Sequence, residues 1–174
     1  MDFEITVSPL AKSDIPSILE IEYDSQPEPW TEKAFLEEIN RANSSVLVAR
    51  LPAGDPVGAP FPGVAGYICF WSVAGEIQIL NIAVRKTLRR RGIARKLIEL
   101  AIRTGWEQHA GCVSLEVRKS NSAALKLYES FGFIVTGERP NYYEVQKESA
   151  ILMELDISEP EQEKNREGNL PHGC

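Results

Sequence analysis

The sequence predicts one mixed α/β domain, and three observations lead to this prediction. Segments rich in β-forming residues and segments with apolar residues at helical spacing follow in the order strand, two helices, three strands, helix, strand, helix, two strands. Two of the strands, 64–73 and 76–84, are separated only by Ala74 and Gly75, which is typical of an antiparallel hairpin. The alternation is too irregular for a doubly wound parallel sheet, so a mixed sheet is expected.

The first half of the chain contains two helices between strands. Ser13 or Asp14 can cap the first helix, which has Pro16 in its first turn, and Thr31 is the expected N-cap of the second. The expected elements are a strand at 3–10, one helix within each of the segments 12–24 and 29–41, and a strand at 45–51. The segment 52–63 is dense in proline and glycine, so it is interpreted as a surface connection to the hairpin.

The second half alternates more regularly. Asn121 is the expected N-cap of the last helix and Gly132 its expected end. The expected elements are a helix at 92–106, a strand at 112–119, a helix at 121–132, and strands at 133–139 and 149–157. Residues 158–174 are polar and without periodicity, so the domain is expected to span 1–157 and the tail 158–174 to be disordered.

Composition limits the possible functions. The formal net charge of −6 argues against a general nucleic-acid binder, because phosphate neutralisation needs a basic surface. The N-terminus does not read as a secretory signal, and no apolar stretch approaches the roughly 20 residues that span a bilayer, so we expect a cytoplasmic protein without a membrane partner. The 3 cysteines lack paired spacing, which predicts reduced thiols, no disulfide and no metal site.

Positive charge is concentrated where a strand passes into the helix expected at 92–106. The arginines at this junction are Arg89, Arg90, Arg91 and Arg95. Cations oppose the macrodipole at a helix N-terminus unless an anion is bound there, and the first backbone N–H groups have no partner within the helix. Gly92 would let a ligand approach this backbone closely. The pattern predicts a phosphate-bearing ligand, although a solvated basic face is the alternative; neither the Rossmann nor the Walker glycine pattern is present.

The R-x-x-G-x-A pattern of Arg89, Gly92 and Ala94 resembles the acetyl-CoA signature of the Gcn5-related N-acetyltransferase superfamily. The segments "PWTEKAF", "SLEVRKSNSAALKLYESFGF", "RPNYY" and "AILMEL" resemble the ribosomal-protein-alanine N-acetyltransferases of bacteria, the RimI type. The resemblance covers residues 3–157. It implies a bent mixed sheet of about seven strands flanked by four helices.

The resemblance also implies acetyl-CoA as acetyl donor. The pantetheine arm would meet Asn121 and the main chain of one strand, at Ile82, Ala83 and Val84. The diphosphate would lie on the loop formed by Arg90, Arg91, Gly92, Ile93, Ala94 and Arg95. Many relatives have proline where this chain has Lys86 and glycine where it has Ala94. The alanine could narrow the space for the diphosphate slightly.

Two residues have the chemistry for proton transfer. Apolar residues alternate on one face of strand 112–119, which places Glu116 on the other face, and acids are uncommon in strands. The residues alone leave open that Glu116 faces solvent or pairs with Arg118, and that Tyr128 is a core aromatic. The resemblance implies that Glu116 is the general base and Tyr128 the general acid toward the coenzyme A thiolate. For an ordinary tyrosine of pKa ~10, proton transfer to a thiolate whose acid has a pKa of ~8.5 is mildly uphill.

The acceptor is expected to be an amine in its neutral form. The α-amine at a protein N-terminus, with a pKa of ~8, is neutral in roughly one-tenth of molecules at pH 7, whereas a lysine of pKa ~10.4 is neutral in only a few molecules per ten thousand. This difference favours N-terminal acetylation. The resemblance implies the N-terminal alanine of the eighteenth protein of the ribosomal small subunit. Tyr142 and Tyr143 match the family's peptide-side segment, but a role in the core is equally open.

Two alternative functions remain. One is the same chemistry on other protein N-termini or on a small amine. The other is a non-catalytic sensor that binds acyl-CoA, and the presence of both Glu116 and Tyr128 argues against it.

Overall fold

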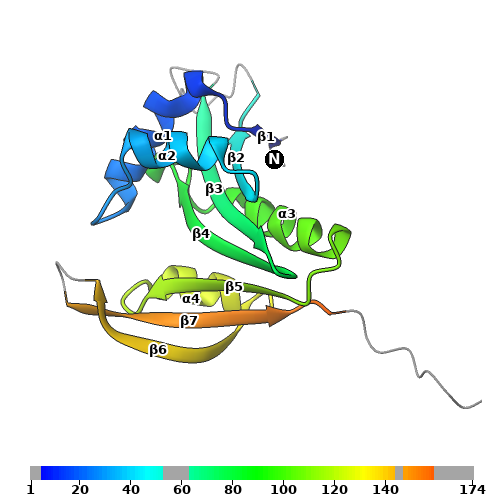
Figure 1. The fold of residues 1–174 in the computed structure, drawn as a ribbon. Helices are drawn as coiled ribbons and strands as arrows, with labels where there is room; N and C mark the ends of the chain where they lie inside the picture. The colour runs from blue at the N-terminus through cyan, green and yellow to red at the C-terminus, as the bar shows by residue number, and fades with distance from the viewer. Residues whose placement is uncertain (1–4, 53–62, 144–146, 159–174) are drawn as a thin grey trace, which may run out of the picture.

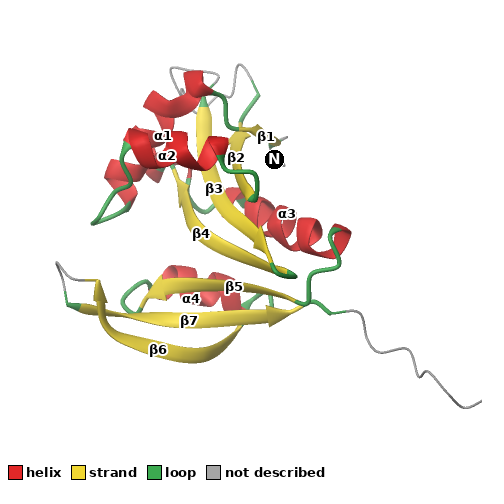
Figure 2. Cartoon of the chain, viewed as in Figure 1, coloured by secondary structure: helices red, strands yellow, loops and turns green. Residues whose placement is uncertain are grey.

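In the described part of the chain, seven strands form one mixed sheet (Figure 1 and Figure 2). The computed structural model describes residues 5–52, 63–143 and 147–158. The spatial order is β1-β2-β3-β4-β5-β7-β6, in which β4 and β5 are parallel and every other neighbouring pair is antiparallel. The strands are β1 (Thr6–Pro9), β2 (Ser44–Arg50), β3 (Val64–Val73), β4 (Glu76–Val84), β5 (Cys112–Arg118), β6 (Ile134–Tyr143) and β7 (Glu148–Asp156).

Helices cover both faces of this sheet (Figure 1). Alternation along β3 divides the core, because Tyr67 and Cys69 pack in the cluster of α1 and α2, whereas Ile68 and Phe70 pack in the cluster of α3. The α-helices in the described ranges are α1 (Ile15–Ser25) and α2 (Glu32–Asn40) on the first face, and α3 (Ile93–Glu107) and α4 (Ser122–Glu129) on the second. Two short 3-10 helices, η1 (Lys12–Asp14) and η2 (Lys86–Leu88), precede α1 and α3.

The predicted order of strands and helices is confirmed, and so are two predicted helix caps. The side chains of Thr31 and Asn121 each accept a hydrogen bond from the backbone N–H three residues further along the chain. Asp14 is the N-cap residue of α1 by position, but its carboxylate accepts hydrogen bonds from the backbone of Ala11 and from Arg50 instead. The resulting ion pair ties the start of α1 to the end of β2.

The predicted glycine cap at the end of the last helix is confirmed. The helical turns end at Glu129, and Gly132, with a φ of 92°, closes the helix end by donating from its N–H to the Glu129 oxygen, while the N–H of Phe133 donates to the Tyr128 oxygen. The end predicted for the next strand is wrong. The next strand runs to Tyr143 and not only to Arg139. Pro140 does not end it, because β6 is the edge strand of the sheet, where a missing N–H can face away from the ladder.

Two further predictions lie outside the described residues. They are the surface connection, apart from its ends at Pro52 and Gly63, and the tail, apart from Ser158. No helix in the described ranges is long and apolar enough to cross a membrane.

The sheet opens between β4 and β5. These strands pair only from Glu76 with Cys112 to Ile79 with Leu115, and beyond that point they diverge (Figure 1). The register of β3 against β4 shifts at the same place, so that Leu80 is an extra residue in β4. Because a β-bulge bends its strand and increases its twist, it accounts for the separation of β4 from β5.

Candidate active site

A cleft of ≈ 600 Å³ lies where β4 and β5 separate. Its walls come from these two strands, from α1 and the segment after it, from α4 and its N-cap, and from the end of β6. Of the residues that the sequence singled out, it brings together Ile82, Glu116, Asn121, Tyr128, Tyr142 and Tyr143.

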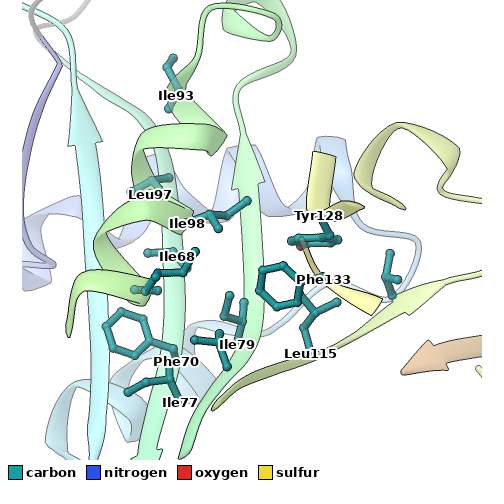
Figure 3. Packing of buried hydrophobic residues seen from close by; sticks show 14 of the residues in the cluster. Ile68, Phe70, Ile77, Ile79, Ile93, Leu97, Ile98, Leu115, Tyr128 and Phe133 are labelled. Atoms are coloured by element: carbon teal, nitrogen blue, oxygen red, sulfur yellow. The ribbon is translucent and has the colours of Figure 1, made fainter. Parts of the chain in front are cut away.

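Glu116 and Tyr128 reach this cleft from opposite faces of the sheet. Val117, next to Glu116 in β5, packs with α3 and α4, so Glu116 faces the side of α1 and α2. Tyr128 comes from α4 on the other side, where its ring packs against Phe133 with centroids 5.6 Å apart (Figure 3). A group held between the separated strands could therefore be reached by a carboxylate from one side and by a phenol from the other.

Glu116 forms an ion pair that the sequence did not indicate. Its Oε1 lies 2.9 Å from Nη1 of Arg139 on β6. The side chain of Glu116 is 30% exposed and that of Arg139 53%. The Tyr142 side chain is a second neighbour of Glu116. Burial and the adjacent Glu116 carboxylate both raise the pKa of Tyr142. Arg118, which the sequence left open as a partner of Glu116, forms ion pairs with Glu28 and Glu148.

Tyr128 is buried in the apolar cluster and has an exposed fraction of 5%. Burial is the main cause that raises the pKa of this phenol above its ordinary value, and Tyr143 adds to the effect. Tyr128 therefore stays protonated throughout the neutral range. It suits the role of a hydrogen-bond donor better than that of a group that gives up its proton completely.

The start of α3 has the features expected of an anion site. Gly92 is its N-cap, with a φ of 78° and no side-chain cap for the first N–H groups. A Cβ built at Gly92 would have no atom within 4 Å, so the backbone here is open to a ligand. The diphosphate of acetyl-CoA fits this surface, because unpartnered amides and the helix dipole both favour negative charge.

The arginines at this site are not all directed at it. The Arg89 side chain donates to the main-chain oxygen of Val84 at 3.2 Å and to Ser25 Oγ at 3.0 Å, so it braces α1 against the end of β4. Arg95 donates to Ser130 Oγ and lies over the ring of Phe131, which directs it toward the end of α4. Two of the four arginines at this junction are thus engaged in contacts within the protein.

The other residues predicted to bind the donor could contact a ligand only through main-chain groups or, at Asn121, through the side-chain amide. The side chains of Ala83, Val84 and Ile93 are buried, so these residues could meet a ligand only through their backbone. Asn121 uses its side-chain oxygen to cap α4, which leaves its amide N–H groups as the donors that could face the cleft.

A buried polar network on the α1 side of the cleft was not predicted. Glu22 of α1 is 0% exposed and lines the cleft. Its Oε1 accepts hydrogen bonds from Asn81 Nδ2 at 3.0 Å and from the backbone N–H of Trp30 at 2.8 Å. The Tyr67 hydroxyl donates to its other oxygen. The sequence carried a signal, since Glu22 occupies the apolar stripe of its helix four residues after Ile18.

Arg118 joins several walls of the cleft to one another. It lies 3.3 Å from Glu28, in the segment after α1, and 3.5 Å from Glu148 at the start of β7. Its guanidinium also stacks 3.6 Å from the ring centroid of Tyr143. These contacts fix the segment after α1 relative to the end of β6. They also place Tyr142 and Tyr143 in the cleft wall rather than in the core.

Comparison with known proteins agrees with this geometry. The model of the acetyltransferase (GNAT) family matches residues 15–133. The chain belongs to this family. As a GNAT protein it is an N-acetyltransferase, and the predicted fold is confirmed.

Among the relatives, a [ribosomal protein bS18]-alanine N-acetyltransferase of Salmonella typhimurium is 36% identical over 155 residues, covering 88% of this chain and 98% of the relative. The crystal structure of the ribosomal-protein-S18-alanine N-acetyltransferase from Escherichia coli has a TM-score of 0.78 at 31% identity, covering 92% of this chain and 99% of that one. A NatC complex bound to Gag peptide and CoA has a TM-score of 0.74 at 27% identity, covering 89% and 99%.

Other chemistry finds little support in the described residues. They contain no group of three or more His, Cys, Asp or Glu side chains that could hold a metal ion. Cys69 and Cys112 are free thiols, and Cys174 lies outside the described ranges. Burial raises the pKa of Cys69 to about 12, which makes it a poor nucleophile.

Proposed function

We propose that this GNAT enzyme transfers acetyl from acetyl-CoA to the α-amine of an N-terminal alanine on a ribosomal small-subunit protein. The observation that carries the proposal is the placement of Glu116 and Tyr128 on opposite faces of β5, both lining one cleft. The acceptor is supported by the relatives named for this reaction, which match almost their full length.

The donor would bind from the face of α3 and α4. Backbone N–H groups of residues 92–95 would hold the diphosphate, and the main chain of 82–84 with the Asn121 amide would hold the pantetheine arm. When bound, acetyl-CoA supplies an acetyl group activated as a thioester. The narrowing expected from Ala94 is small, because this residue is only half-buried and the space beside Gly92 is open.

Glu116 and Tyr128 would divide the proton transfers. Glu116, facing α1 and α2, takes the proton that the amine releases as its nitrogen bonds to the acetyl carbon, directly or through water. Tyr128, on the opposite side, directs its hydroxyl at the sulfur as the carbon–sulfur bond breaks. Because burial raises the pKa of Tyr128, full proton loss is more uphill than for an exposed phenol, and a strong hydrogen bond to the sulfur is favoured.

The acceptor would enter on the face of α1 and α2, between Trp30 and the two tyrosines of β6. Its α-amine is the easier substrate, since roughly one-tenth of such amines are neutral at pH 7. The net charge of −6 would help a basic ribosomal protein to approach. A ribosomal acceptor would also fit the cytoplasmic location expected from the sequence.

The test is acetylation of synthetic peptides. Peptides that begin with the N-terminal sequence of the ribosomal acceptor, and matched peptides starting with Ser or Met, are incubated with acetyl-CoA, and thiol release and the acetylated atom are measured. We expect turnover at the α-amine with alanine first, and none with an N-terminally blocked peptide. Equal rates on all N-termini would favour the broader acetyltransferase, and tight donor binding without turnover on any amine would favour the sensor.

Glu116→Gln tests the assigned base. The substitution keeps the shape of the side chain but removes the proton acceptor, so turnover should fall about 100-fold while the Kd for acetyl-CoA stays within about twofold. Glu99→Gln, on the exposed side of α3, is the matched control and should leave both values unchanged. An unchanged rate for Glu116→Gln would remove Glu116 as the base.

A further inference from the structure

The ion pair between Arg139 and Glu116 has no place in the proton transfers described above. Arg139 lies on β6, two strands away from Glu116 on β5. Ala150 of β7 is paired with both Arg118 and Arg139, so the two arginines stand on the same face on either side of a small side chain. The long Arg139 side chain extends from there to Glu116, at 2.9 Å.

The arginines on this face have different partners. Arg118 is closer to Glu116 along the chain, but it is held by Glu28 and Glu148. Arg139 therefore supplies the positive charge that meets Glu116. It also lies near the ring of Tyr142, with the guanidinium carbon 5.5 Å from the centroid.

A carboxylate beside an amine creates a difficulty for this reaction. Negative charge a few ångströms away stabilises the ammonium form of the acceptor, and that form has no lone pair with which to attack. The other carboxylates that face the acceptor side, Glu22, Glu28 and Glu148, add to this tendency. Arg118 and Arg139 supply positive charge that offsets part of this negative charge. The remaining titratable groups around the cleft are Tyr128, Tyr142 and Tyr143.

We infer that Arg139 is a positioning residue that holds Glu116 in an ion pair so that the arriving acceptor amine is not retained as unreactive ammonium. The inference rests on the proposed role of Glu116 but not on the identity of the acceptor. The Glu116–Arg139 pair itself carries no net charge, and the guanidinium disfavours a second cation beside it. The carboxylate stays in place and can still receive the amine proton.

The experiment compares Arg139→Gln with wild type across pH 6 to 10, at saturating acetyl-CoA and acceptor. Loss of the cation should raise the pKa of the bound amine, so the neutral fraction at a given pH falls. Since the pair is half-exposed and screened, we expect kcat roughly fivefold lower at pH 7 and the acid limb of the kcat profile about 0.7 pH unit higher. At high pH, where the amine is neutral in both proteins, the rates should converge.

Two variants accompany it. Arg139→Lys keeps the charge and should restore most of the acid limb. Arg103→Gln removes an arginine of similar exposure from a surface pair on α3, and should leave the profile unchanged. A loss of rate that is equal at every pH, or no loss, would overturn the inference. Wild-type turnover on alanine peptides tests the proposed acceptor separately, because the variant ratio can be measured on whichever primary amine the wild type acetylates.

Discussion

Glu22→Ala is expected to destabilise the protein more than the replacement of any exposed residue on the same helix. Glu22 is completely buried and accepts hydrogen bonds from Trp30 N, Asn81 Nδ2 and the Tyr67 hydroxyl. Each buried donor left without an acceptor costs about 1–3 kcal/mol. Water entering from the cleft would satisfy part of this demand, so we expect a loss of about 3–5 kcal/mol in the free energy of unfolding.

Thermal unfolding followed by circular dichroism measures this loss. At about 2–4 °C per kcal/mol for a domain of this size, Tm should fall by roughly 10 °C. Glu20→Ala is the control on the same helix, because Glu20 is 67% exposed and its pair with Arg85 at 3.3 Å is worth at most ~1 kcal/mol. A Tm for Glu22→Ala within about 3 °C of wild type, or an equal fall for Glu20→Ala, would refute the reasoning.

The remaining predictions concern the donor side. Gly92→Ala places a methyl group in open space at a φ of 78°, so it should cost only about 1–2 kcal/mol of stability but raise the Kd for acetyl-CoA at least about tenfold in calorimetric titration; an unchanged Kd would contradict the assignment of this backbone. Tyr128→Phe should lower kcat about 100-fold with little change in the Kd for acetyl-CoA. Burial raises the pKa of Tyr128 in the folded state, so the stability that its protonated hydroxyl contributes is complete below pH ~10 and is lost as the pH rises further. Tyr128→Phe should therefore lessen the fall of Tm between about pH 10 and 11. An identical slope in the two proteins would count against the burial of the hydroxyl.

The order of the elements could be predicted because local patterns determined it. Period-2 and period-3.6 patterns, the hairpin at Ala74 and Gly75, and the caps at Thr31 and Asn121 all act within a few residues. The extension of β6 past Pro140 was missed, because the effect of a proline depends on whether its strand lies at the sheet edge.

The site was predicted only in part, for a related reason. A signature in one segment predicted the uncapped helix start at Gly92, but side-chain directions depend on neighbours distant in sequence. The contacts of Arg89 with Ser25 and of Glu116 with Arg139 join different elements and leave no local pattern. The bulge at Leu80 that opens the cleft likewise depends on the register between two strands.

The opened edge of β4 and the start of α3 are the surfaces proposed to hold the donor. Amide hydrogen exchange, with and without acetyl-CoA, measures this directly. Protection should increase at residues 82–84 and 92–95, next to the cleft and at the uncapped helix start. Protection confined to other segments, with those amides exchanging as fast as before, would contradict this donor site.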